Sequence, residues 1–295
     1  MAERLVTDAD VDRDCYQFFR RSPEDFLDEL MSQAEHARNY NLQAFEDPGI
    51  VSGYVNEDYH RIRREEAAGL LGAALSRSDA PRGPVLEVAG GAESMLDEEA
   101  LGRETIGSDG VFAAVAKGVA NGVIQRGLQL DASRPWPLAD ESLAGVVAGE
   151  YLEHLRADGW RFLYEANRTL KHLGTLVLTV PNTATLHDRY RFLLGVDPRQ
   201  ITSDSDNKLF AHSGYFTASS LKGLLQSFGF EPQGLRSNLV GWQLPNGRWI
   251  ESRLLARAFP SIGGSLVVSA RKVSEPDFES PGGTLIKAVL DTGRV

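Results

Sequence analysis

The sequence predicts an α/β protein: a doubly wound, mostly parallel sheet with helices on both faces, preceded by an N-terminal helical extension. Two observations predict this fold class. Short apolar, β-favouring segments alternate with segments at helical spacing between residues 58 and 273. The first strand, 85–88, leads through the glycine turn 89–91 into a helix-compatible run, 94–101. A buried strand, a tight glycine turn and a helix start are typical of sheets that bind nucleotides.

The remaining elements are predicted in order along the chain. Residues 143–149 are small and apolar throughout, as in a parallel strand that is buried on both faces. Further strands are expected at 105–109, 123–130, 175–180, 231–240 and 265–270. Further helices are expected at 59–75, 111–120, 161–173 and 217–229.

The chain divides into three expected parts. They are an N-terminal helical extension (1–57), an α/β domain (58–273) and a C-terminal tail (274–295). Ser22, followed by proline and two acids, indicates a helix start in the extension. That helix either roofs the substrate site or packs against the core or a partner subunit. Two long inserts, 183–216 and 241–263, are expected over the site, because connections of this length are usually lids or binding loops.

The composition narrows the class of partner. Acidic residues outnumber basic ones by 41 to 31, which gives a net charge of −10, and no long basic run offsets it. Nucleic acid is therefore a poor candidate substrate. The single cysteine, Cys15, excludes an internal disulfide framework and suits a reducing cytoplasm. No signal-peptide or membrane-spanning apolar run is seen, so we expect a cytoplasmic protein without a membrane partner.

Two acids mark the ends of the first two strands, Glu87 and Asp109. In an open α/β sheet, ligands bind beyond the carboxyl ends of the strands, where a carboxylate can accept both hydroxyls of a ribose. A dinucleotide site would need G-x-G-x-x-G, but the turn reads E-V-A-G-G-A-E, and Glu93 would repel a phosphate. Glu87 instead suits a cofactor that carries an amino group or a sulfonium.

Residues 85–91 resemble the first motif of the class I S-adenosylmethionine-dependent methyltransferases, roughly (V/I)-L-(D/E)-(V/I)-G-x-G-x-G. Ala89 replaces the first glycine of that motif and Glu93 the last. Residues 150–155 match the family's "vLEHL", and the strand ending Pro181-Asn182 is common in it. The resemblance covers about residues 58–272. It implies a seventh, antiparallel strand between Gly264 and Arg271, which makes the sheet seven-stranded.

The same resemblance implies that the cofactor is S-adenosyl-L-methionine and indicates which residues bind it. These residues are Glu87, Ala89, Gly90, Gly91, Asp109, Asp131, Ala132 and Glu150. His154 would face the point of methyl delivery, where an imidazole can take a proton near neutral pH, although it could instead support the pocket. Candidates for binding the acceptor lie in the insert 183–216: His187, Tyr190, Arg191, His212 and Tyr215.

No metal site is expected from the spacing of the ligand-type residues. No two histidines stand at H-x-x-x-H or similar spacing, and one cysteine cannot build a zinc knot.

The function that these features indicate is transfer of a methyl group to an oxygen or nitrogen of a small-molecule or sugar-like acceptor, in small-molecule biosynthesis. A homodimer is compatible with the sequence. Two other classes stay open. Ala89 and Glu93 would suit a non-catalytic or repurposed S-adenosylmethionine-binding protein, and a nicotinamide-dependent oxidoreductase is disfavoured by the missing third glycine.

Overall fold

The computed structural model describes residues 58–90, 94–155, 158–198, 212, 214–244, 246–279 and 281–291. The predicted helix that starts at Ser22 lies outside these residues, with the whole extension 1–57. Among the helices of the described ranges, none combines the length and the apolar character that a membrane crossing needs.

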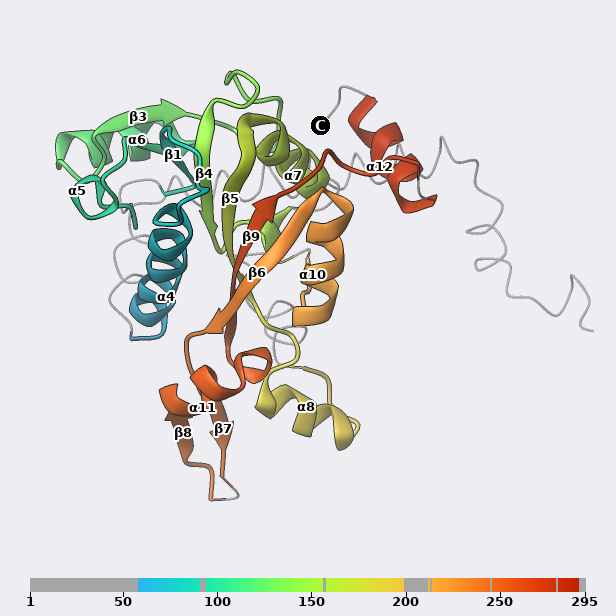
Figure 1. The fold of residues 1–295 in the computed structure, drawn as a ribbon. Helices are drawn as coiled ribbons and strands as arrows, with labels where there is room; N and C mark the ends of the chain where they lie inside the picture. The colour runs from blue at the N-terminus through green and yellow to red at the C-terminus, as the bar shows by residue number, and fades with distance from the viewer. Residues whose placement is uncertain are drawn as a thin grey trace, which may run out of the picture.

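One seven-stranded sheet organises the described residues, in the order β3-β2-β1-β4-β5-β9-β6 (Figure 1). The five strands from β3 to β5 run parallel, and β9 pairs antiparallel with β5 and β6. The predicted fold class and its antiparallel seventh strand are confirmed. The strands are β1 (Val85–Val88), β2 (Thr105–Asp109), β3 (Arg126–Gln129), β4 (Leu143–Gly149), β5 (Leu170–Pro181), β6 (Phe230–Ser237) and β9 (Ser265–Lys272).

The alternation of side chains along β4 shows how the sheet is buried on both faces. Val146 and Ala148 belong to one apolar cluster, whereas Val147 between them belongs to the other. Successive residues of a strand point to opposite faces, so a continuous apolar run is what a strand covered on both sides requires.

Helices cover the two faces unequally. α4 (Asp58–Leu75) packs across β4, β5 and β9 on one face. α6 (Phe112–Ala120) lies on the same face, over the outer strands β2 and β3. The opposite face is covered by α7 (Asp158–Thr169) and α10 (Ala218–Ser227), and α12 (Pro281–Asp291) packs against α7.

The C-terminal tail contains a helix that the sequence did not predict. Ile286 and Leu290 of α12 join the larger apolar cluster, and the guanidinium of Arg161 donates to the carbonyl oxygen of Leu290 at 2.6 Å. The tail is therefore part of the core packing as far as residue 291.

Two predicted helices differ from those observed. The run 94–101 is helical only in α5 (Glu98–Leu101), because Asp97 caps it by accepting from the backbone N–H of Ala100 at 3.0 Å. The helix predicted to reach residue 173 ends at Thr169, since Leu170 already pairs with Leu143 in the sheet.

The inserts gather beyond the end of β6, where Figure 1 shows α8, α11 and the two short strands close together. These elements are α8 (Leu186–Leu193), β7 (Val240–Gln243), β8 (Trp249–Ser252), α11 (Arg253–Ala258) and the 3₁₀ turn η2 (Pro260–Ile262). The insert 183–216 was expected as a loop without regular structure, which is wrong for residues 186–193 because they form α8. Its apolar residues Phe192 and Leu193 are 70% and 83% exposed, so they form no buried stripe.

Asn182, the first residue after β5, fastens these inserts to the sheet. Its fully buried amide donates to the carbonyl oxygens of Gly263 at 2.8 Å and Ser261 at 3.1 Å. The amide oxygen accepts from the backbone N–H of Ala184 at 3.0 Å. One side chain thus connects the end of β5, the start of α8 and the turn before β9.

We predict that Asn182→Ala lowers the free energy of unfolding by about 2–3 kcal/mol, because it leaves buried carbonyl and N–H groups without partners. Urea denaturation monitored by circular dichroism measures the change. The control is Gln125→Ala at an exposed position, which should stay within about 0.5 kcal/mol of the wild type. Equal stability of the Asn182 and Gln125 variants would contradict this role of the amide.

Candidate active site

The sheet reverses its winding between β1 and β4, which pair in parallel with Val88 opposite Ala148. Chain connections leave these two strands in opposite directions, and crevices at such points bind ligands in open α/β sheets. Just past the pair, Ala89 and Glu150 adopt left-handed backbone conformations, with φ of 57° and 51°. For residues other than glycine this costs roughly 1–2 kcal/mol each. Strain of this kind gathers at functional sites, so the edge where β1 and β4 end is the candidate site.

Backbone and side-chain hydrogen bonds join the ends of the first three strands. The N–H of Gly90 donates to the carbonyl oxygen of Ser108 at 3.0 Å, and the Ser108 hydroxyl donates to the carbonyl oxygen of Glu87 at 2.7 Å. The N–H of Leu130 donates to the carbonyl oxygen of Asp109 at 2.9 Å. The predicted residues at the ends of β1, β2 and β3 therefore form one continuous edge.

The carboxylate of Glu87 is buried at this edge, where it supports the turn that follows β1. The backbone N–H of Met95 donates to both of its oxygens at 3.0 Å, and the Ser94 hydroxyl donates to Oε2. Burial raises the pKa of the Glu87 carboxyl, and the hydrogen bonds from Ser94 and Met95 oppose that shift. Glu87 thus ties the far side of the glycine turn back to the strand. Gly91 lies outside the described residues.

The two aspartates are fixed by their own loops. Asp109 Oδ1 accepts from the N–H of Val111 at 2.9 Å, and burial raises the pKa of the Asp109 carboxyl. Asp131 accepts from the backbone N–H of Ser133 at 3.1 Å and forms an ion pair with Arg134 at 3.2 Å. The neighbouring Ala132 is almost fully buried. These residues occupy the positions that the sequence predicted, and their roles toward a cofactor stay predictions.

Glu150 connects β4, β5 and α4. Its Oε2 lies 3.0 Å from Nη1 of Arg63, and its Oε1 accepts from the Thr179 hydroxyl at 3.1 Å. The backbone N–H of Glu150 donates to the carbonyl oxygen of Thr179 at 2.9 Å. A buried charge needs such a partner, because an unpaired one would lose its hydration without compensation. Sequence reasoning missed Arg63 and Thr179, although Arg63 stands at helical spacing from the apolar residues Ala67 and Leu70.

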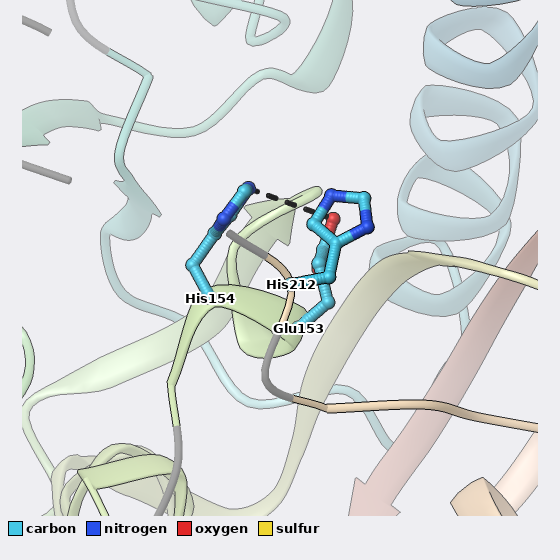
Figure 2. A group of neighbouring side chains, drawn as sticks. All are labelled: Glu153, His154 and His212. Carbon is cyan, nitrogen blue, oxygen red and sulfur yellow. Dashed lines mark ion pairs between the residues drawn. The ribbon is translucent and has the colours of Figure 1, made fainter. Parts of the chain in front are cut away.

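A second group of side chains meets beside this edge: Glu153 and His154 from the 3₁₀ turn η1 (Leu152–His154), and His212 from the long insert (Figure 2). The rings of His154 and His212 are 4.9 Å apart, inclined at 62°. Nε2 of His154 lies 4.0 Å from Oε1 of Glu153. Glu153 is 1% exposed and His154 8% exposed. The sequence named both histidines, but it gave Glu153 no role.

The other predicted acceptor-binding residues lie apart from this group or at the surface. His187 of α8 is buried and packs edge-on against Trp249 of β8, with ring centroids 5.3 Å apart. Arg191 donates through Nε to the carbonyl oxygen of Asp197 at 3.0 Å. Tyr190 and Tyr215 are 58% and 42% exposed. Of the five candidates, His212 is brought into ring contact with His154.

Comparison with known proteins identifies the family of this chain and proteins of similar fold. A family model described as a methyltransferase domain matches residues 59–233. A protein of Bacillus halodurans that is assigned as a methyltransferase is similar over 71% of this chain and 100% of its own, with a TM-score of 0.52 at 18% identity. The YcgJ protein of Bacillus subtilis is similar over 71% and 99%, with a TM-score of 0.50 at 14% identity. At these identities the likeness shows the fold. Comparison with curated proteins finds no match.

We predict that Ala89→Gly raises the free energy of unfolding by about 0.5–1 kcal/mol. Glycine removes the roughly 1–2 kcal/mol cost of the left-handed backbone and adds back about 0.5–1 kcal/mol of chain entropy. The matched control is Ala116→Gly at an exposed position inside α6, which should lower the stability by about 0.8–1.0 kcal/mol. Equal losses in both variants, measured by thermal denaturation, would show that the turn at residue 89 is not left-handed.

Proposed function

This chain belongs to the class I S-adenosylmethionine-dependent methyltransferase family, and on that premise we propose that it transfers a methyl group to an oxygen or nitrogen of a small-molecule or sugar-like acceptor. The observation that carries the proposal is the edge where β1 and β4 end in two strained residues, Ala89 and Glu150, with the partly buried Asp109 at the end of the neighbouring β2. Family membership implies S-adenosylmethionine as the methyl donor.

In this proposal the edge formed by β1, β2 and β3 holds the cofactor. Asp109 accepts the ribose hydroxyls, and the turn at Gly90 lets the backbone approach closely. A carboxylate at Glu87 places negative charge near the cofactor's positive groups. Asp131 and Ala132 lie beside the adenine. Glu150 fixes the other side of the candidate site through Arg63 and Thr179.

For methyl transfer, the acceptor must be aligned with the methyl group and must lose a proton. The sulfonium supplies an activated methyl group, so the protein has to place the acceptor in line at about 3 Å and assist its deprotonation. His154 serves that purpose in our proposal. Tyr59 is a poorer candidate, because burial and the charge of Glu150 raise its pKa to about 12. His60 is poorer too, because burial lowers its pKa to about 4 and makes it a weak base.

The acceptor would enter from the side of the inserts 183–216 and 241–263. The acidic balance of the chain supports a small molecule over nucleic acid. The cytoplasmic location and the homodimer remain predictions of the sequence.

Calorimetric titration of the full chain with S-adenosylhomocysteine and with NADH tests the proposal. We expect binding of the first and none of the second. Tight S-adenosylhomocysteine binding without turnover across a panel of hydroxyl and amine acceptors would favour a repurposed binding protein, and binding of NADH alone would favour an oxidoreductase.

We predict that Asp109→Ala weakens S-adenosylhomocysteine binding by at least about tenfold, or about 1.4 kcal/mol, because the ribose hydroxyls lose their acceptor. Calorimetry measures the affinity, and circular dichroism checks that the variant is folded. The control is Asp79→Ala, an acid that pairs with Arg271 and is largely exposed, which should bind as the wild type does. Unchanged affinity in a folded Asp109 variant would remove this residue from the cofactor site.

A further inference from the structure

Glu153, His154 and His212 bring three potential metal ligands to one point. One oxygen or nitrogen atom from each side chain lies within 4.8 Å of the other two. Figure 2 shows Glu153 and His154 on one turn and His212 arriving from a separate segment beside them. The three residues come from the end of the connection after β4 and from the insert that follows α8, both on the carboxyl side of the sheet.

The donor set has a definite chemical preference. Two imidazole nitrogens and one carboxylate oxygen are the ligands of many Zn²⁺ sites that keep an open coordination position. Imidazole suits Zn²⁺, Fe²⁺, Co²⁺ and Ni²⁺, whereas Mg²⁺ and Ca²⁺ prefer sites made of oxygen atoms alone. The set therefore points to a divalent transition-metal ion.

The burial of Glu153 and His154 also favours a bound metal ion. Glu153 is 1% exposed and His154 is 8% exposed, so both side chains have left water. A bound cation would compensate the lost hydration of a buried carboxylate. The carboxylate of Glu150 pairs with Arg63 and accepts from Thr179, so it is not one of the ligands.

The distances between the ligand atoms of the three side chains need only small changes to fit a metal ion. With metal–ligand bonds of about 2.0–2.2 Å, a tetrahedral site places ligand atoms about 3.4 Å apart, so the widest pair must close by roughly 1–1.5 Å. Side-chain rotation can supply this, and hydrogen bonds hold described backbone close to the three residues. The N–H of Gly214 donates to the carbonyl oxygen of Glu153 at 2.8 Å, and the N–H of Thr183 donates to the carbonyl oxygen of Phe216 at 2.9 Å. The first bond holds Gly214 against the turn that carries Glu153, and the second holds Phe216 beside the end of β5.

We propose that Glu153, His154 and His212 bind a divalent transition-metal ion of the Zn²⁺ class, with an open position that takes a hydroxyl of the acceptor. Binding of the ion stands on these three side chains alone. Its use in catalysis rests on the proposed methyl transfer.

In that use the ion activates the acceptor as a nucleophile. A cation lowers the pKa of a bound hydroxyl, so the acceptor loses its proton to water near neutral pH. The resulting oxygen forms the new O–C bond as the C–S bond of the sulfonium breaks, and neutral S-adenosylhomocysteine leaves. His154 then assists deprotonation as a ligand of the ion, and the acceptor is a hydroxyl compound.

The test titrates the full chain, freed of metal with a chelator and dialysed, with Co²⁺ and with Zn²⁺. We expect a visible d–d absorption band for Co²⁺, one equivalent of Zn²⁺ bound by calorimetry, and much weaker binding of Mg²⁺. His212→Ala should weaken Zn²⁺ binding by at least about 100-fold, since loss even of an outer-shell partner typically costs about 10–100-fold. Glu153→Gln, which keeps the shape and removes the charge, should weaken it as well.

The control is His172→Ala, which removes an exposed histidine of β5 and should leave Zn²⁺ binding unchanged. S-adenosylhomocysteine affinity is measured on each variant, since it should survive the loss of either ligand residue and reports a folded cofactor site. Absence of Zn²⁺ binding in a wild-type chain that binds S-adenosylhomocysteine would overturn this inference and leave the proposed function standing. Unchanged Zn²⁺ binding in folded His212→Ala and Glu153→Gln, or an equal loss in His172→Ala, would also overturn it.

Discussion

The parallel pairing of β1 with β4 is the constraint on which the rest of the site depends. It sets Val88 beside Ala148, so the segments that follow β1 and β4 leave the sheet next to each other and turn away in opposite directions. Both turns use left-handed residues, at Ala89 and Glu150. The candidate site, the orientation of the Glu150 carboxylate and the course of the chain toward His154 all follow from this pair of strands.

Polar contacts divide the candidate site into two unequal halves. On the β1 side, Glu87 and Asp109 are held by hydrogen bonds from their own loops. On the β4 side, Glu150 is held by an ion pair to Arg63 in a helix on the sheet's face. The first half is therefore built from local sequence, and the second requires segments that are distant along the chain.

The difference between local contacts and contacts of distant segments also explains which parts of the fold and of the site could be predicted from the sequence. Strands such as 143–149 were readable because burial on both faces leaves a continuous apolar run. The edge strand β3 was placed only approximately, because its residues are largely exposed. α8 was missed although Leu186, Tyr190 and Leu193 stand at helical spacing, which is a local pattern that could have revealed it. The approach of His212 to His154 depends on how the insert returns to the sheet, which no local pattern records.

The position of β9 has a consequence for synthesis of the chain. β9 lies between β5 and β6 and is the last strand in sequence, so neither neighbour finds its partner until residues 265–272 are made. Until then β5, whose residues 175–181 are all buried in the finished sheet, presents an open apolar edge. A chain that stops short of residue 265 would keep that edge and tend to associate through it. Residues 265–272, late in the sequence, thus cover an edge that the earlier strands leave open.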